Sequence, residues 1–313
     1  MYDIIINPAS KAGHGKGIWD RVQQELEHRK VEYQAHFTSA PGDATGITEE
    51  IMNSDREAYY IIIIGGDGTL NEAINGIQDF SKVKIGYIPA GSSNDFSRAV
   101  HIERNPVKAI SNILDVGHTK EIDIGVASYR DCTKHNIMTE RKFCVSSGIG
   151  FDAAVCEEAL HSKVKDVLNK LHMGKLTYLM IAIRQVLTGP AIPCTITLDN
   201  EREIYLEKFL FVASMIQPYE GGGFMFCPHA DCTDGMVETC VVGAISKPKM
   251  FRILPTAYKG NHLKFKNIDE YHSKTVSVHL EAPIWLHTDG EIPAKTDQVS
   301  FICQEQKMNL FCE

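Results

Sequence analysis

The chain has 313 residues, with a hydrophobic share of 43% and a charged share of 23%, which exclude a disordered or fibrous protein. The net charge of −8 argues against general nucleic-acid binding, which needs a basic face. The longest purely aliphatic run, 61–64, is far shorter than the ~20 apolar residues of a membrane span. The nine cysteines are scattered, and no basic segment precedes an apolar one at the start, so we expect reduced thiols and a cytoplasmic location.

The first 125 residues alternate between strand-like and helix-like segments. The expected strands are short apolar runs at 2–6, 59–64 and 83–88. The expected helices show apolar residues at helical spacing, at Ile18, Trp19, Val22 and Leu26, at Leu70, Ala73, Ile74 and Ile77, and at Ala109, Ile110, Ile113 and Leu114. Strands that alternate with helices predict crossover units and a parallel sheet, and the continuous apolar run predicts a strand buried on both faces.

Strand-like segments dominate from residue 126 onward. They lie at 142–145, 194–198, 209–214, 237–242, 275–280, 284–287 and 299–303, and one helical stretch at 162–187 interrupts them. Many short strands separated by Gly, Pro and Asp are typical of an antiparallel sandwich or barrel. The sequence therefore predicts an α/β domain over 1–125 and a β-rich domain over 126–302.

A glycine-rich loop, Gly65-Gly66-Asp67-Gly68-Thr69, follows the strand at 59–64 and opens the next helix. Glycines allow a close approach of the backbone to a ligand, and a helix N-terminus offers N–H groups and a partial positive charge to a phosphate. The alternative is a tight turn in which Asp67 or Thr69 only caps the helix. The place of the loop, at the carboxyl edge of a parallel sheet, favours a ligand site.

A second loop, Pro89-Ala90-Gly91-Ser92-Ser93-Asn94-Asp95-Phe96-Ser97-Arg98, follows the strand at 83–88. Helix capping by Asp95 and a surface position for Arg98 would explain this segment equally well. Because parallel strands end at the same sheet edge, we expect this loop and the 65–69 loop to form one cleft.

The loop at 7–17 follows the first strand and is rich in glycine. It is not a P-loop, since Gly17 follows Lys16, and it is not a dinucleotide fingerprint, since Ile18 stands where the third glycine belongs. Its position at a third strand end nevertheless suits contact with phosphate or ribose.

Together these motifs resemble the diacylglycerol kinase catalytic domain, which soluble bacterial lipid kinases, sphingosine kinases and ceramide kinases share. The 65–72 motif is also shared with NAD kinases and, more loosely, with phosphofructokinases. Further matches follow along the chain at Asn7-Pro8-x-Ser10, Ile122-Asp123, Gly148-x-Gly150-Phe151-Asp152-Ala153, Gly221-Gly222-Gly223-Phe224, Asp234-Gly235 and Asp289-Gly290-Glu291.

The resemblance implies an NAD kinase- or phosphofructokinase-like first domain, a β-rich lipid-substrate domain, and return of the segment 303–313 to the first domain. It also implies ATP in the cleft, bound by Asn7, Pro8, Ala9, Ser10, Lys11, Thr38, Gly65, Gly66, Asp67, Gly68, Thr69, Leu70, Asn71 and Ser92. Ser92 replaces the usual threonine and keeps its hydroxyl. Lys11 stands where a glycine is common, which leaves the shape of the first loop open.

Three carboxylates are the candidate catalytic residues. By itself Asp289-Gly290-Glu291 reads as an acidic hairpin turn, but the family match makes Glu291 the catalytic base. Asp67 faces the expected phosphate site, where a carboxylate is able to hold Mg²⁺ or its waters, and it is the rival base. Asp95 is the second acidic residue expected, beside Asp67, at this phosphate site.

A second acidic turn, Asp231-Cys232-Thr233-Asp234-Gly235-Met236, is a candidate metal site. Two carboxylates beside a glycine turn are able to bind a hard cation, although a plain surface turn explains the pattern too. The family resemblance places a structural Mg²⁺ there, on Asp231, Asp234 and the backbone carbonyl of Met236.

We therefore expect ATP- and Mg²⁺-dependent phosphorylation of a lipid hydroxyl, with diacylglycerol the leading acceptor and phospholipid biosynthesis the setting. The alternatives are an NAD kinase or other non-lipid kinase, and a nucleotide-binding regulator without activity. Peripheral contact with a membrane is expected, but the basic groups Lys247, Lys249 and Arg252, and Lys259, Lys264 and Lys266, read most simply as solvated loop faces. The identity of the lipid and the formation of a homodimer stay open.

Overall fold

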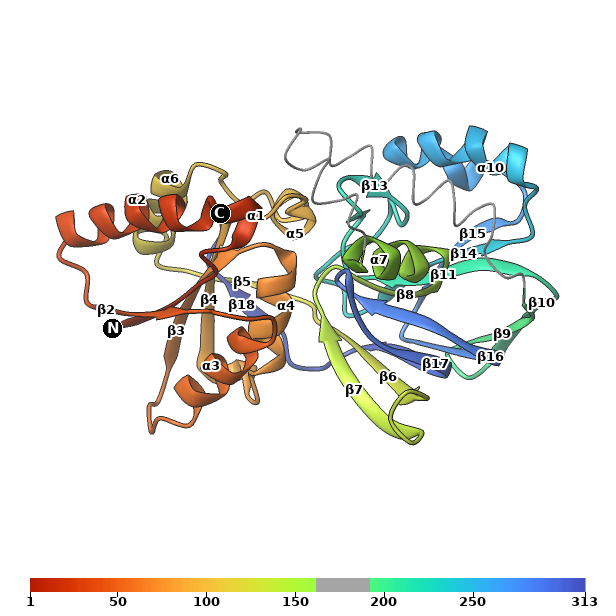
Figure 1. The fold of residues 1–313 in the computed structure, drawn as a ribbon, viewed down its shortest axis with the longest axis horizontal. Coiled ribbons are helices and arrows are strands. Elements are labelled where there is room, and N and C mark those ends of the chain that lie inside the picture. The colour runs from red at the N-terminus through yellow and green to blue at the C-terminus, as the bar shows by residue number, and fades with distance from the viewer. Residues whose placement is uncertain (162–191, 313) are drawn as a thin grey trace.

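The structure is a computed structural model that describes residues 1–161 and 192–312. It contains two large sheets that lie side by side, the first covered by helices and the second built mainly of strands (Figure 1). The helix expected at 162–187 lies outside the described residues. Within the described ranges, no helix is long and apolar enough to cross a membrane.

The first sheet has six strands in the order β2-β1-β3-β4-β18-β5. All neighbouring strands are parallel except β18 and β5, which are antiparallel. β18 comes from the end of the chain and lies between β4 and β5. The strands are β1 (Tyr2–Ile6), β2 (Tyr33–Phe37), β3 (Tyr59–Gly65), β4 (Val83–Pro89), β5 (Lys120–Ile122) and β18 (Met308–Leu310).

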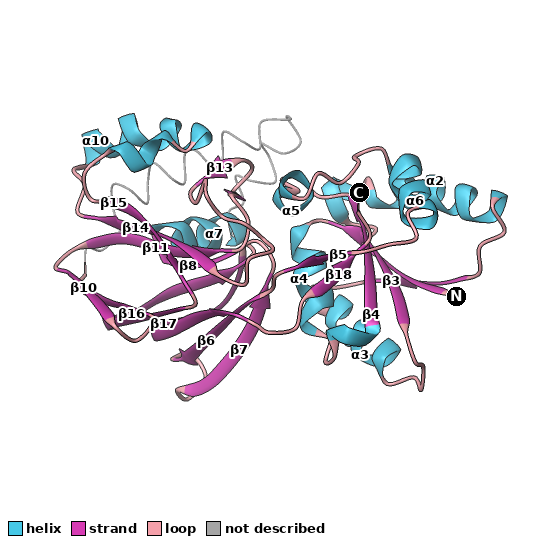
Figure 2. Ribbon diagram, turned by 180° about the vertical axis from the view of Figure 1, so that it is seen from behind, coloured by secondary structure: helices cyan, strands magenta, loops and turns pink. Residues whose placement is uncertain are grey.

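Helices cover both faces of this sheet, so the expected α/β architecture is confirmed (Figure 2). Ile62 and Ile64 pack with α2 and α6, whereas Ile61 and Ile63 pack with α3 and α4. All four isoleucines are at most 1% exposed, as a strand buried on both faces requires. The helical elements are α1 (Ser10–Gly13), α2 (Gly15–His28), α3 (Asp43–Met52), α4 (Asp67–Asn75), η1 (Phe80–Lys82), α5 (Asp95–Ala99) and α6 (Pro106–Asp115).

The sequence patterns did not reveal β2 or α3. β2 lies at the edge of the sheet and is only partly buried, so it has no continuous apolar run. α3 buries only Ala44, Thr48 and Ile51, a stripe too narrow and too polar to stand out in the sequence.

The second sheet is antiparallel and has ten strands. Its main path runs β15-β14-β11-β8-β16-β17-β6-β7, and β9 and β10 extend from β16. Its strands are β6 (Gly125–Asp131), β7 (Ile137–Phe143), β8 (Ser146–Gly150), β9 (Cys194–Leu198), β10 (Arg202–Leu206), β11 (Phe209–Met215), β14 (Val237–Gly243), β15 (Ile268–Ser273), β16 (Thr275–Thr288) and β17 (Glu291–Cys303). The remaining elements are α7 (Phe151–His161), β12 (Tyr219–Glu220), β13 (Phe224–Met225), α10 (Lys247–Ile253), η2 (Leu254–Lys259) and η3 (Asn261–Lys264).

β16 gives the second sheet its two-layered form. Its first half pairs with β9, and its second half pairs with β8 after a register shift between His279 and Ile284. A strand that changes partners at an irregularity is able to turn a corner between two layers. Apolar side chains of β11 and β14 thus share one core with those of β9 and β17, and the expected β-rich sandwich is confirmed.

Two strand expectations were wrong in detail. The strand expected at 142–145 is broken, because β7 ends at Phe143 and β8 begins at Ser146. The N–H groups of Cys144, Val145 and Ser146 instead donate to the Asp289 carboxylate. The strands expected at 275–280 and 284–287 are one strand, β16, since the register shift between them does not end it.

Candidate active site

The glycine loop between β3 and α4 lies against the loop that follows β4. The Ala90 N–H donates to the Gly65 carbonyl at 2.7 Å. A side chain at Gly91 would place its Cβ 2.6 Å from the Gly66 Cα, so the two backbones meet where only glycine fits. The expectation that these loops share one sheet edge is confirmed.

The loop after β1 joins the same edge. The Asn7 amide donates to the Thr69 hydroxyl at 3.0 Å, and its Oδ1 accepts the Ala9 N–H at 3.0 Å. Lys11, where glycine was expected, has φ 49°, the left-handed backbone conformation that glycine adopts at no cost. Thr38 is buried, and its N–H donates to the Ile6 carbonyl at the end of β1.

Asp67 and Asp95 are neighbours. The Asp67 Oδ2 accepts the Asp95 N–H at 2.9 Å. The Asp95 carboxylate accepts Arg98 Nη1 at 2.8 Å and the Gly222 N–H at 2.7 Å. Asp95 therefore joins the first domain to the turn between β12 and β13.

Glu291 reaches this place from the second sheet. Asp289 and Gly290 form the two-residue turn between β16 and β17, with φ 49° and 84°, the signature of a type I′ hairpin. The Asp289 carboxylate also accepts the Asn71 amide at 2.8 Å, which fixes the turn beside α4. A Cβ on Gly68 would lie 2.9 Å from Glu291 Oε1, so the carboxylate of Glu291 rests against the glycine loop.

Enclosure of these acidic groups raises the pKa values of two of them. Burial, followed by the nearby Asp95, raises the pKa of Asp67 to about 7, although the Asp95 N–H lowers it. Burial also raises the pKa of Asp95, while the Gly222 N–H and Arg98 lower it. The Asp67 Oδ1 is buried and has no hydrogen-bond partner within the described ranges. A cation placed here would stabilise the charged form of Asp67.

Comparison with known proteins decides the family. The diacylglycerol kinase catalytic domain family matches residues 2–127, and the YegS C-terminal NAD kinase beta sandwich-like domain family matches residues 145–311. The chain belongs to the diacylglycerol kinase family of lipid kinases.

Named relatives match along nearly the whole chain. Identity is 29% with Bacillus subtilis YtlR, covering 93% of each chain, and 28% with the diacylglycerol kinase of Mycobacterium tuberculosis, covering 94% of this chain and 91% of the relative. A crystal structure of a Bacillus anthracis diacylglycerol kinase matches with a TM-score of 0.69 at 20% identity, covering 100% and 96%. An Archaeoglobus fulgidus NAD kinase in complex with ATP shares the fold more distantly, with a TM-score of 0.51 at 11% identity over 100% and 94% of the two chains.

The remaining residues that the family resemblance implies for ATP binding differ in how exposed their side chains are. Ser92 is exposed at the tip of a loop that Asn94 closes through reciprocal bonds with Gly91. Asn71 is fully buried, and its amide bonds to Asp289 and the Lys142 carbonyl as well as to Arg141. Leu70 is also fully buried. Asn71 therefore links α4 to the second domain, in addition to its bond with Asn75 on the same helix.

A buried ionisable cluster beside the site was missed by sequence reasoning. His287 Nε2 lies 3.0 Å from Asp152 Oδ2 and 3.4 Å from Glu220 Oε1. Burial lowers the pKa of His287, but Glu220 and Asp152 outweigh it and raise the pKa to about 9. Burial raises the pKa of Glu220 to about 7, opposed by His287. The three residues are far apart in the sequence: Asp152 belongs to a recognised motif, Glu220 precedes the three glycines, and His287 lies close to Asp289, but nothing in the sequence relates them to one another.

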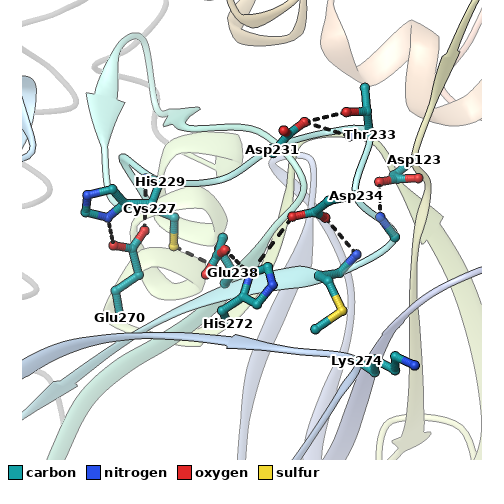
Figure 3. Close-up of polar contacts among 12 residues, drawn as sticks. Asp123, Cys227, His229, Asp231, Thr233, Asp234, Glu238, Glu270, His272 and Lys274 are labelled. Carbon is teal, nitrogen blue, oxygen red and sulfur yellow. Dashed lines mark hydrogen bonds and ion pairs between the residues drawn. The ribbon is translucent and has the colours of Figure 1, made fainter.

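The candidate metal site, residues 231–236, forms a turn in the second domain (Figure 3). Asp231 Oδ1 accepts the Thr233 N–H at 3.0 Å, and Asp234 Oδ1 accepts the Met236 N–H at 2.9 Å. The second oxygen of Asp234, Oδ2, lies 4.0 Å from His272 Nδ1. Gly235 has φ 77°, which only glycine adopts easily.

Glu238 and His272 adjoin this turn, and the sequence did not single them out as candidate metal ligands. Ligand atoms of Asp234, Glu238 and His272 lie within 4.8 Å of one another, and His272 bonds to Glu238 (Figure 3). Asp123 accepts the Gly235 N–H at 2.7 Å, and Lys307 bonds to Asp123 and to the Thr233 carbonyl, each at 2.7 Å. The turn is therefore tied to the crossing between the two sheets.

Proposed function

We propose that this lipid kinase transfers the γ-phosphate of ATP to a lipid hydroxyl, with diacylglycerol the favoured acceptor and phosphatidic acid the product. One observation carries the proposal: Asp67, Asp95 and Glu291, from three distant segments, lie together at the loops that end β1, β3 and β4. Phosphoryl transfer relies mainly on positioning and charge neutralisation, and such loops supply both.

The nucleotide would bind across these loops. The N-terminus of α4 and the backbone of Gly65, Gly66 and Gly68 offer close, positively polarised contacts to phosphates. Residues 7–11 and Thr38 adjoin the same edge, and Ser92 stands exposed at the tip of the facing loop. This arrangement supports the ATP residues that the family resemblance implies.

Glu291 would act as the general base. As the lipid hydroxyl oxygen bonds to the γ-phosphorus, its proton passes to the Glu291 carboxylate, the bond from the γ-phosphorus to the bridging oxygen breaks, and ADP leaves. The hairpin turn holds Glu291 in place, because the Asp289 carboxylate accepts three consecutive N–H groups at the start of β8.

The enclosed acidic centre fits a magnesium ion bound with the nucleotide. Asp67 is the favoured contact, since its Oδ1 is buried without a partner in the described part of the chain. Such an ion would neutralise charge on the phosphates. Asp231, Asp234 and the Met236 carbonyl are hard oxygen donors that fit a second, structural Mg²⁺, and Glu238 and His272 adjoin them.

The test is incubation of the purified protein with γ-labelled ATP, Mg²⁺ and a panel of lipids in mixed micelles. Diacylglycerol, phosphatidylglycerol, a sphingoid base and a prenol should be compared, and we expect labelled phosphatidic acid. Formation of NADP⁺ from NAD⁺ without any labelled lipid would favour the NAD kinase alternative. Tight ATP binding without transfer to any acceptor would favour a regulator.

A further inference from the structure

The segment 247–266 has an unusual charge. It contains six Lys or Arg residues and no Asp or Glu, although the chain as a whole has a net charge of −8. The cations are Lys247, Lys249, Arg252, Lys259, Lys264 and Lys266. Such a local excess needs an explanation in an acidic protein.

Most of this segment forms α10, η2 and η3, an outer layer of the second domain. Met250, Ile253 and Ala257 point inward and are buried in a core with β11 and β14. Five of the cations, Lys249, Arg252, Lys259, Lys264 and Lys266, lie between the inward-facing positions and are exposed. We call the exposed residues Lys249, Phe251, Arg252, Tyr258, Lys259, Lys264 and Lys266 the basic face.

Nearby acidic groups do little to neutralise the basic face. Within residues 1–161 and 192–312, none of its five cations takes part in an ion pair. On the adjoining strand β15, Glu270 is already paired with His229, and Asp269 is exposed. The charge of the face is therefore available to an external partner.

Two exposed aromatic residues stand among the cations. Phe251 is 37% exposed and Tyr258 is 50% exposed. Aromatic rings mixed with Lys and Arg suit the boundary between lipid headgroups and acyl chains, where the cations meet anionic lipids and the rings enter the interface. The acidic chain as a whole argues against nucleic acid as the partner.

The basic face is connected to the active site. The Tyr258 ring stacks on Phe224 with 4.0 Å between centroids. Phe224 follows the three glycines whose Gly222 N–H donates to Asp95. α10, β13 and α5 also lie on the same side of the molecule, at the top of Figure 1. A surface bound here would therefore lie beside the loop that contacts the catalytic centre.

We propose that the basic face docks this kinase on membranes that contain anionic lipid and so brings the active site to its acceptor. The inference rests on the proposed function for its purpose, but docking itself requires neither ATP nor turnover. It replaces the simpler expectation of solvated loops, because the structure combines both basic groups with exposed aromatic rings in one layer.

The test is co-sedimentation of the full chain with vesicles of phosphatidylcholine alone or mixed equally with phosphatidylglycerol. A variant with Lys259→Glu, Lys264→Glu and Lys266→Glu is compared with a control of the same charge change, Lys30→Glu, Lys82→Glu and Lys108→Glu, at exposed sites of the first domain. We expect the first variant to bind mixed vesicles more than about 100-fold more weakly, since each cation near an anionic surface contributes about fivefold. The control variant should lose far less affinity for the mixed vesicles. A Phe251→Ser variant should show a smaller loss.

Thermal melting of each variant checks that the fold is kept. Wild-type protein that binds both vesicle types equally, or neither, would overturn the docking surface, as would equal binding by the first variant and the control. Binding to a DNA duplex but to no vesicle would overturn it as well. Activity on a short-chain, monomeric diacylglycerol separates the two proposals, because loss of docking should leave it unchanged, whereas an incorrect function predicts no such activity at all.

Discussion

Two carboxylate clusters lie close together in this molecule, and they differ in how their buried negative charge is compensated. Asp152 and Glu220 are buried against their own cation, His287. Asp67 and Asp95 are also enclosed, but the Asp67 Oδ1 has no partner in the described ranges, and its pKa is raised to about 7. The first cluster is neutralised from within, whereas in the second Arg98 pairs with Asp95, and Asp67 has no ion pair among the described residues. The comparison therefore separates a cluster that contains its own cation from one in which a buried carboxylate oxygen has no partner among the described residues.

The largest effect should follow from removing the charge of Asp67. We expect Asp67→Asn to abolish kinase activity without unfolding the protein, because the carboxylate is enclosed at the proposed phosphate site and has no ion pair among the described residues. Labelled lipid formation and a thermal melt measure the two properties. Asp20→Asn, exposed on α2, is the control. Near-normal turnover of Asp67→Asn would reduce the glycine loop to helix capping.

Glu291→Gln should have the next largest effect. We expect kcat to fall by ~10² to 10⁴-fold, the usual worth of a general base, with ATP affinity nearly unchanged. The Glu291 carboxylate rests against Gly68, and in the proposed mechanism it contacts only the acceptor, whereas Asp67 should also affect the nucleotide. Steady-state kinetics and nucleotide titration of both variants distinguish these roles, and Glu281→Gln, exposed on β16, is the control. An unchanged kcat would leave Asp67 as the better base.

His287→Asn should break the internally neutralised cluster. Removing one partner of a buried ion pair costs on the order of 3 kcal/mol, so we expect a clear loss in the free energy of unfolding. Denaturant titration measures this loss, and His279→Asn, exposed on the same strand, should change little. Equal stability of the two variants would mean that the cluster contributes nothing net.

The same cluster predicts the pH dependence of stability. The pKa of His287 rises from 6.5 to about 9 on folding, so its contribution is fully present below about pH 6.5 and is lost as the pH rises through 9. The pKa of Glu220 is raised from 4.5 to about 7, so its deprotonation also makes the protein less stable as the pH rises, but over the lower range between about 4.5 and 7. Melting temperatures from pH 6 to 10 should therefore fall more steeply for wild type than for His287→Asn. Parallel curves would contradict this assignment.

The smallest effect concerns the exposed turn. Asp231→Ala with Asp234→Ala should remove the Mg²⁺-dependent rise in melting temperature. An ion that binds only the folded state stabilises it by about 2.7 kcal/mol at a hundredfold excess over Kd. Glu201→Ala with Glu207→Ala removes the same charge from another exposed part of this domain. If the double variant keeps the full response to Mg²⁺, the turn is an ordinary one.

Much of the fold could be predicted because local sequence determined it. The run at 59–64 is apolar at every position, and a strand buried on both faces is what such a run requires. β2 and α3 were not predicted, because both are only partly buried and so lack a clear apolar pattern. The break between β7 and β8 could not be predicted either, since its cause is the carboxylate of Asp289, distant in sequence.

The candidate catalytic residues could be identified from the sequence, but only through motifs. The backbones of the two loops meet at Gly66 and Gly91, where a side chain would not fit. The glycines of each loop were visible in the sequence. Glu291 sits in a turn of ordinary composition, and the family resemblance alone singled it out. Its contact with Gly68 supports the proposed role, which stays a prediction until the variants are measured.

The sequence by itself determined the elements whose physics is local: buried strands, glycine turns and helix starts, since each depends on neighbours a few residues away. Tertiary structure alone decided which charges meet. His287, Glu220 and Asp152 have no spacing that relates them, and the pKa values of His287 and Glu220 shift only when folding excludes water and brings these groups within 3.4 Å of one another. Electrostatic interaction depends on distance in space and on burial, and neither can be read along the chain.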